Sequence, residues 1–409
     1  MLDGLRKLGF EKGRAEFRSE CEAFSRAHYL GFCVIKSLPG CPVGKTILRC
    51  YGEQTEKGAV RRFDGTRLYS AHLAGVELSV QGLPFQQQDL GVSACATTAL
   101  WSALHQFSEF ESFGSATPSQ ITMLASQHSL PYGRAMPQEE GLSVDQMCQA
   151  VQALKVAPTL LRADDFETAR GYIFSAVASG NAPVLILERT DSREKHAVTV
   201  AGMKLEKDAR RRTLERGISD LAADVCGLYL HDDRIGPYVS ASVHRRGKRL
   251  RLHMTLSDRS EDWDVLQILI PTHAKIRLSF AALRRIAMDM VFTLHAYRET
   301  QHSAKLSRGA ILFDTWISRS HAYIEKLFTS RGVLPEKVRR LCEEVSLPRY
   351  LGIVRLSSNY LDPIEILVDT TSTERNTNFC AILTASNKHP DTHRAASFLA
   401  NEYDCHSII

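Results

Sequence analysis

The chain has 409 residues, of which 44% are hydrophobic and 24% are charged. These proportions are ordinary for a globular protein, and the length is sufficient for two domains with a smaller third element. The formal net charge of +5 is a mild excess that argues neither for nor against a nucleic-acid partner.

The sequence lacks the marks of a secreted or membrane-spanning protein. Its first residues, MLDGLRKLGFEKGRAEF, contain no apolar stretch typical of a signal peptide, and no run of about 18 apolar residues occurs in the chain. The ten cysteines are scattered and form no CxxC pair. Such spacing in a chain of this size indicates reduced thiols, so we predict a cytoplasmic protein that does not bind membranes.

Residues 1–81 are predicted to form an N-terminal segment of mixed α/β structure. A polar helix is expected near residues 12–28. Short strands, separated by Gly and Pro turns, are expected at GFCVIKSL, TILRCYG and RLYSAHL. We expect this segment to lead into the next domain and to pack on it.

Residues 82–240 are predicted to form a domain in which helices come first and strands follow. The helix ATTALWSALHQF should be buried, because its apolar residues recur at helical spacing over a wide face. Further helices are expected at residues 117–128, 142–154 and 165–180, and strands at 182–188, 196–204 and 226–232. A charged insertion, KLEKDARRRTLERG, separates the last two strands and should be exposed. This order predicts an α+β arrangement with an antiparallel sheet.

Residues 241–409 are predicted to form a C-terminal α+β domain. The sequence around its start, VSASVHRRGKRLRLHMTL, is typical of a basic hairpin that turns at Gly247. Further strands are expected at residues 265–271, 350–358, 363–371 and 379–386, and helices at 280–297, 314–328 and 335–345.

Cys95 is the candidate nucleophile. It stands where the turn-rich segment QQQDLGVSAC ends and the apolar helix begins. A thiol is a good nucleophile only as thiolate, and the unpaired N–H groups of a first helical turn favour that anion. A cysteine at a helix start is ordinarily a small buried residue, so the hypothesis depends on partners for it.

Two residues at strand ends are the predicted partners. His196 begins the strand HAVTVAG after a polar loop, where an imidazole can accept the thiol proton. Asp232 ends the strand GLYLHD, where a carboxylate can hold the imidazole in the required tautomer. Asp233 is adjacent and could take the same part.

The ordered set of Gln-rich turn, Cys at the head of an Ala- and Leu-rich helix, HAVTVAG and LYLHDDRIG resembles the papain-like fold, and its layout is closest to the bacterial C39-type peptidases. The resemblance covers roughly residues 82–240. It implies a papain-like fold in which a helical part with the nucleophile helix packs on an antiparallel sheet, with flanking mixed α/β segments. In that group a Gln before the Cys donates to the oxyanion hole, a His opens a strand ending in Gly, and an Asp closes the next strand. These roles would fall on the residues Gln88, Cys95, His196 with Gly202, and Asp232 with Gly236.

The sequence departs from that pattern at three places. Ala96 follows the Cys where Gly is usual, and Gln88 lies seven residues before Cys95, one more than the usual gap. Either Gln87 or Gln88, or neither, therefore serves the oxyanion hole. The charged insertion between the His and Asp strands is also longer than expected.

The resemblance implies a thiol-dependent hydrolase, a cysteine peptidase that cleaves a peptide or isopeptide bond through Cys95, His196 and Asp232. The alternatives are an acyl transferase or deamidase on the same fold, and an inactive binding or scaffold protein. A peptide or protein is the expected substrate, and a further protein partner is possible through residues 1–81 or 241–409. No cofactor is expected, and no metal either, because the sequence has neither an HExxH pattern nor a Cys/His quartet.

Two other motifs are assigned ordinary roles. GCPVGKT places only three residues between Gly40 and Gly44, and Pro42 removes one N–H, so we interpret it as a turn and not a phosphate-binding loop. The basic run HRRGKRLRLH is interpreted as a solvated hairpin. Because no aromatic residues alternate with its charges, a nucleic-acid partner is not expected.

Overall fold

The structure is a computed structural model. It describes the residues 19, 22–23, 27–37, 40–55, 58–73, 76–88, 95–107, 116–127, 141–206, 213–214, 217–300, 310–329, 334–373, 378–384 and 389–408. The helix predicted near residues 12–28 and the middle of the charged insertion lie largely outside this set. Within it, no helix is both long and apolar enough to span a bilayer.

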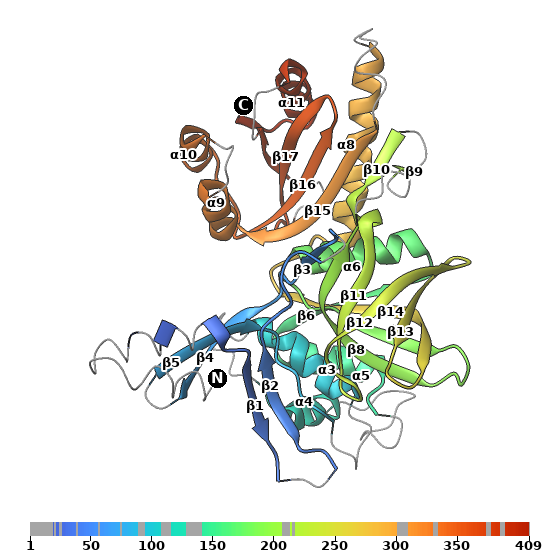
Figure 1. The fold of residues 1–409 in the computed structure, drawn as a ribbon. Helices are drawn as coiled ribbons and strands as arrows, with labels where there is room; N and C mark the ends of the chain where they lie inside the picture. Colours follow the sequence, from blue (N-terminus) through green and yellow to red (C-terminus); the bar gives the residue numbers. More distant parts are fainter. Residues whose placement is uncertain are drawn as a thin grey trace.

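A closed barrel of six antiparallel strands organises the middle of the chain (Figure 1). In barrel order the strands are β7 (Val184–Arg189), β8 (Lys195–Leu205), β11 (Val225–Asp232), β12 (Gly236–Arg246), β13 (Arg249–Thr255) and β14 (Ser260–His273), and β14 pairs with β7 to close the ring. Two more strands extend the sheet, since β3 (Val60–Arg62) pairs with β8 and β6 (Val156–Arg162) pairs with β14.

Helices cover one wall of the barrel. They are α3 (Cys95–Leu104) with the 3-10 turn η1 (His105–Phe107), α4 (Pro118–Ala125) and α5 (Val144–Ala153). The predicted starts of α4 and α5 are confirmed, because Thr117 and Ser143 each form a capping box with a Gln three residues later. Both faces of strand β7 are buried, which explains why its sequence is an unbroken apolar run. Val184 and Ile186 face the helices, whereas Leu185 and Leu187 face the barrel interior.

A second sheet of seven strands forms the C-terminal part of the molecule (Figure 1). In sheet order the strands are β19 (His406–Ile408), β18 (Phe379–Thr384), β17 (Leu361–Asp369), β16 (Tyr350–Ser358), β15 (Ile311–Arg319), β10 (Ile218–Asp220) and β9 (Thr213–Leu214). Its helices are α8 (Phe280–Thr300), α9 (Ser320–Thr329), α10 (Pro335–Glu344) and α11 (Pro390–Glu402). The 3-10 turn η3 (Leu221–Asp224) links β10 to the barrel strand β11.

The N-terminal segment contributes two hairpins. The first pairs β1 (Gly31–Ile35) with β2 (Val43–Leu48), and the second pairs β4 (Arg67–Leu73) with β5 (Val76–Gly82). Tyr238 of the barrel ties this segment down, because its hydroxyl accepts from the Leu83 amide at 3.0 Å and donates to the Leu48 carbonyl at 3.1 Å. The expected packing of this segment on the next domain is therefore present.

Two expectations from the sequence differ from the structure. Residues 314–319 belong to strand β15 and not to a helix, because Phe313 and Ile317 enter one core while Trp316 enters another, which hides the alternation of a strand. The helix expected there begins only at Ser320. In addition, the basic hairpin turning at Gly247 is confirmed, but its strands belong to the barrel, which runs to His273 and past the domain boundary placed at residue 240.

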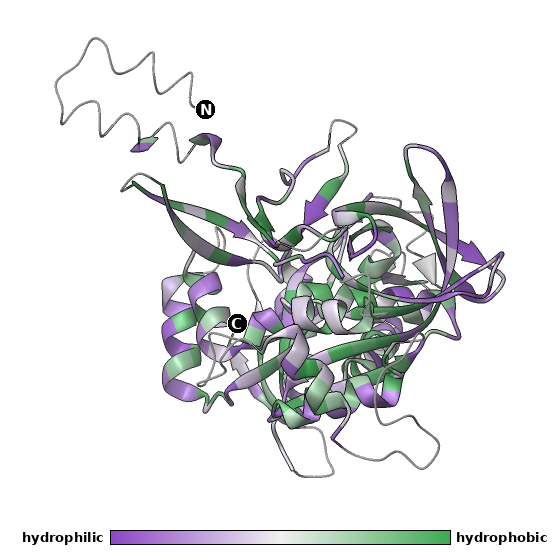
Figure 2. Ribbon diagram, turned by 90° about the horizontal axis from the view of Figure 1, so that it is seen from below, coloured by the Kyte–Doolittle hydropathy of each residue, from purple (hydrophilic) through white to green (hydrophobic). Residues whose placement is uncertain are grey.

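The largest core cluster is continuous between the barrel and the C-terminal sheet. Helix α6 (Phe166–Ala178) lies between them, and its residues Ile173 and Phe174 share a core with Val198 of the barrel and Phe313 of the sheet. Figure 2 shows hydrophobic colour concentrated in the interior, whereas the projecting hairpins carry both hydrophobic and hydrophilic colour.

Candidate active site

Cys95 is the first residue of helix α3, as the sequence predicts, and it is half-buried. Small residues let this helix approach the barrel closely: Ala96 and Ala99 share a core with Ala197 and Ala201 of strand β8. The approach is fixed by a hydrogen bond of 2.8 Å from the Thr199 hydroxyl to the Ala99 carbonyl. The N-terminus of α3 therefore lies beside the start of β8.

His196 is the second residue of β8 and is buried, with 4% of its surface exposed. Strand β11 runs antiparallel to β8, and His231 pairs with Thr199. The end of β11 consequently lies next to the beginning of β8, which brings Asp232 to His196.

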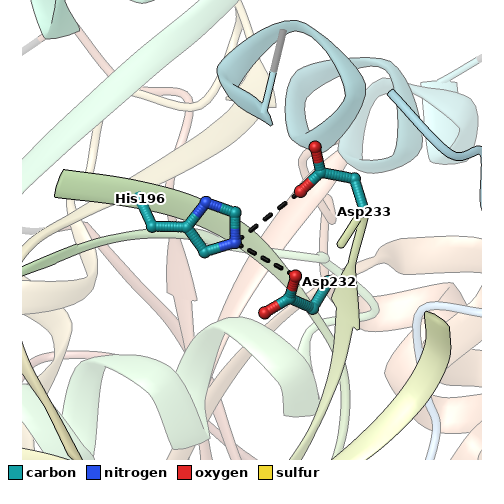
Figure 3. Close-up of side chains that lie close together, drawn as sticks. All are labelled: His196, Asp232 and Asp233. Carbon is teal, nitrogen blue, oxygen red and sulfur yellow. Dashed lines mark ion pairs between the residues drawn. The ribbon is translucent and has the colours of Figure 1, made fainter. Parts of the chain in front are cut away.

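One imidazole nitrogen faces two carboxylates (Figure 3). Nε2 of His196 lies 3.2 Å from Oδ1 of Asp232 and 3.6 Å from Oδ1 of Asp233. Cys95 lines the same cleft as His196, and its side chain raises the pKa of that imidazole. Because Nε2 is directed at the two acids, Nδ1 is the ring nitrogen that remains for the thiol. The structure thus brings together the Cys, the His and both candidate acids.

The surroundings of His196 favour its charged form. Burial alone would lower the pKa of His196, but hydrogen bonds with Asp232 and Cys95 and the negative charge of Asp232 outweigh burial and raise the pKa to about 10. His196 is therefore an imidazolium at neutral pH. A positive charge beside a cysteine favours the thiolate, which is the reactive form.

Arg234 holds Asp232 in place. Oδ1 of Asp232 accepts from the Arg234 backbone amide at 3.0 Å and from Nε at 3.3 Å, and Oδ2 accepts from Nη2 at 3.2 Å. Burial would raise the pKa of Asp232, but its hydrogen bond with His196 and the charges of His196 and Arg234 hold that pKa well below its usual range. Asp232 is therefore ionised across the physiological pH range.

A Trp and a Glu behind the site were missed by the sequence reasoning. The ring of Trp263 lies 5.6 Å from that of His196 and 4.9 Å from the guanidinium carbon of Arg234. The Trp263 indole donates to Glu261 at 3.1 Å, and Glu261 lies 3.5 Å from Arg234. Both residues are on β14, outside the predicted domain of residues 82–240, and their signal in the sequence is the segment EDWD on an apolar strand.

Asp233 has a different environment from Asp232. Among the described residues, neither of its buried carboxylate oxygens has a hydrogen-bond partner. Burial raises the pKa of Asp233 to about 6, and the charge of Asp232 adds to this effect while that of His196 opposes it. Asp232 is thus the better-held acid, and Asp233 is a second carboxyl group that titrates near neutrality.

A cleft of about 690 Å³ opens at Cys95 and His196. Gln88 lines this cleft together with Ala96. Gln87 lies elsewhere, because its side-chain oxygen accepts from the Val43 amide at 3.4 Å. Of the two glutamines, Gln88 is therefore the one that shares the cleft with Cys95.

Gly202 and Gly236, the two glycines of the predicted pattern, are required by the local backbone geometry. A Cβ on Gly202 would lie 2.3 Å from the Phe63 ring and 2.6 Å from the Arg62 carbonyl oxygen. The end of β3, which pairs with β8, can therefore lie this close to β8 only because residue 202 is Gly. Gly236 begins β12 with a φ of +152°, a conformation that favours glycine, and pairs with Asp232.

The cluster also has the composition of a metal site. One ligand atom each from His196, Asp232 and Asp233 lies within 4.8 Å of the others. However, the guanidinium of Arg234 already balances Asp232 and donates two hydrogen bonds to its oxygens, and the Arg234 backbone amide donates a third. The geometry fits a hydrogen-bonded Cys–His–Asp set better than a cation site.

Comparison with models of known families found no match to this chain, and comparison with curated proteins found none either.

Proposed function

We propose that this protein is a thiol-dependent hydrolase of the papain-like kind, a cysteine peptidase that cleaves a peptide or isopeptide bond. The observation that carries the proposal is the position of His196, which shares a cleft with Cys95, is acted on by its side chain, and lies 3.2 Å from Asp232. A nucleophile, a base and an orienting acid within reach of one another are what covalent acyl transfer requires. The helix packed on an antiparallel barrel agrees with the layout that the resemblance implies.

In the proposed reaction, the Cys95 thiolate attacks the scissile carbonyl and forms a tetrahedral oxyanion. The Gln88 amide and the Cys95 backbone N–H donate to this oxyanion. The imidazolium of His196 then gives its proton to the leaving amine, and the C–N bond breaks to leave a thioester on Cys95. Water attacks the thioester, His196 takes the proton of that water, and the carboxylic acid departs with regeneration of the thiol.

The cleft has the properties of a peptide-binding surface. Its floor is apolar and includes Leu142, Met147 and Ile186, while Glu194 and Lys195 stand at its charged rim. Apolar surface with a few polar groups is typical of a site that buries part of a ligand. We therefore propose a peptide or protein substrate. Cytoplasmic location stays a prediction that rests on the cysteine pattern.

Labelling with iodoacetamide at neutral pH tests the nucleophile. We expect Cys95 to be alkylated much faster than the exposed Cys342, with the modified residue identified by mass spectrometry. Cys95→Ala should abolish the fast phase, and Cys342→Ala should leave it unchanged. Equal fast labelling of the wild type and Cys95→Ala would rule out the proposal.

Hydrolysis itself is tested with a mixture of peptides and a mass readout. Products should carry a new carboxylate in the wild type and be absent with Cys95→Ala. If an added amine captures the acyl group and no carboxylate forms, the protein is a transferase. If neither product forms although Cys95 is alkylated rapidly, the site is that of a binding protein.

A further inference from the structure

A second cavity of about 360 Å³ lies where three parts of the molecule meet. The segment Asp64–Arg67 of the N-terminal region forms one side, Gln106 and Phe107 after helix α3 form another, and Ile317–Arg319 at the end of β15 form a third. None of its lining residues lines the cleft at Cys95. Its volume is at the lower end of the range for small-molecule sites.

Gln106 is the residue that points to a ligand. It is buried, with 8% of its surface exposed, and it lines this cavity. Among the described residues, neither its amide oxygen nor its amide nitrogen has a hydrogen-bond partner. An unsatisfied buried polar group is destabilising, so the unpaired oxygen and nitrogen of Gln106 indicate a ligand that supplies both a donor and an acceptor. An amide group does so.

The charge of the cavity points to an anion. The guanidinium groups of Arg67 and Arg319 are in the lining, and Arg67 donates to the carbonyl of His105, next to Gln106. Asp64 is the acid of the lining, and its charge is balanced by Arg62 at 2.9 Å. Guanidinium groups bind carboxylates in a two-point geometry, so a carboxylate is the expected anionic group.

Apolar side chains complete the wall. Phe107, Ile276 and Ile317 line the same cavity as Gln106 and the two arginines. We propose that this cavity binds an N-acylated apolar amino acid, with its carboxylate on the arginines, its amide on Gln106 and its side chain against this apolar wall. The proposal does not depend on the chemistry at Cys95, because the two sites share no residue.

Calorimetric titration of the full chain with N-acetyl-L-leucine tests the site. Two analogues each remove one feature: N-acetyl-L-leucinamide has no carboxylate, and 4-methylpentanoate has no amide. We expect N-acetyl-L-leucine to bind and each analogue to bind about tenfold more weakly or worse, the loss of one good polar contact. Equal affinity for all three, or no binding of N-acetyl-L-leucine up to about 10 mM, would overturn the proposal.

Two matched substitutions locate the binding. Gln106→Leu should weaken binding about tenfold, whereas Gln88→Leu, the same change in the cleft at Cys95, should leave the affinity unchanged. The reverse pattern would place the ligand in the cleft and would refute the second site. Gln106→Leu removes two unpaired buried atoms and should not lower the melting temperature. If it fails to fold, Arg319→Gln, which should also weaken binding about tenfold, provides the same comparison.

Discussion

Asp232 and Asp233 are neighbours in sequence, yet their carboxylates meet different surroundings. Arg234 donates three hydrogen bonds to Asp232, whereas the buried oxygens of Asp233 have no such donor among the described residues. Both lie within 3.6 Å of Nε2 of His196. In the proposed mechanism Asp232 orients the imidazolium, and Asp233 adds a negative charge that depends on pH.

Asp232→Asn should therefore impair the proposed reaction strongly. Loss of the orienting carboxylate lowers kcat by roughly 10⁴-fold in a Ser–His–Asp triad. We expect a decrease of that order in peptide hydrolysis and slower alkylation of Cys95 at neutral pH. Rates measured for peptide hydrolysis and iodoacetamide labelling check this expectation. An unchanged labelling rate would show that Asp232 does not stabilise an ion pair between the Cys95 thiolate and the His196 imidazolium.

Asp233→Asn should act mainly on the pH profile. The carboxyl group of Asp233, whose pKa is raised to about 6, is ionised above that pH and protonated below it. The labelling rate of the wild type should show a step as the pH crosses 6, because a negative charge beside the Cys95–His196 pair appears or disappears there. In Asp233→Asn that step should be absent, with less than a tenfold change at pH 8. A profile identical to the wild type would remove Asp233 from the site.

At the scale of elements, local sequence patterns predict where Cys95, His196 and Asp232 lie, whereas the residues that support them are set by tertiary contacts. Cys95, His196 and Asp232 lie at the ends of strongly patterned elements, so their positions could be predicted from order and setting, and their catalytic roles stay a prediction. The supports Arg234 and Trp263 could not, because they reach the site only when the barrel closes between β14 and β7. The choice between the two acids also depended on which carboxylate Arg234 holds.

Gly202 shows how one residue sets the contact between two strands. Phe63 and Arg62 lie against its Cα, so the side chain of Gly202→Ala would meet atoms 2.3 and 2.6 Å away. We expect this variant to lose about 1–3 kcal/mol of unfolding free energy in a urea titration. Gly52→Ala is the control, because a Cβ there has no neighbour within 4 Å. Equal midpoints for the two variants would contradict this account of β3 on β8.

A row of charges crosses the C-terminal sheet. Asp314 on β15 pairs in register with Arg355 on β16, and Arg355 pairs with Glu365 on β17. Asp314 is buried, its nearest approach to Arg355 is 3.9 Å, and its Oδ1 has no partner among the described residues. Burial therefore raises the pKa of Asp314 to about 6, with the charge of Arg355 opposing.

This raised pKa predicts a pH-dependent stability. The unfolded chain ionises Asp314 near its ordinary pKa of 3.8, whereas the folded chain keeps the proton until about pH 6. The protonated Asp314 therefore contributes fully to the unfolding free energy below pH 3.8. This contribution is lost as the pH rises to 6, and the loss is at most about 3 kcal/mol. Asp314→Asn should lack this loss, so its unfolding free energy relative to the wild type should rise between pH 4 and pH 7. A constant difference would refute the assignment.

At the scale of the whole molecule, the barrel and the C-terminal sheet are interleaved. The insertion between the His and Asp strands carries β10, which pairs in parallel with β15. Ser175 of α6 hydrogen-bonds to Thr315 of β15 at 2.8 Å, and Arg284 of α8 forms an ion pair with Asp220. A domain boundary drawn at residue 240 from the order of predicted elements and the extent of the resemblance could not reveal this, because strands distant in sequence make the connection.

This interleaving predicts one cooperative unfolding transition. The barrel and sheet share a buried core, so neither can open without exposing apolar surface of the other. Scanning calorimetry should give a single peak whose calorimetric and van't Hoff enthalpies agree. Gly171→Ala places a Cβ 2.2 Å from the guanidinium carbon of Arg284, which is buried and paired with Asp220. Because Arg284 would have to leave this ion pair, the variant should lower the whole transition, whereas Gly52→Ala should not. Two peaks, only one of which moves in Gly171→Ala, would mean that the two parts fold independently.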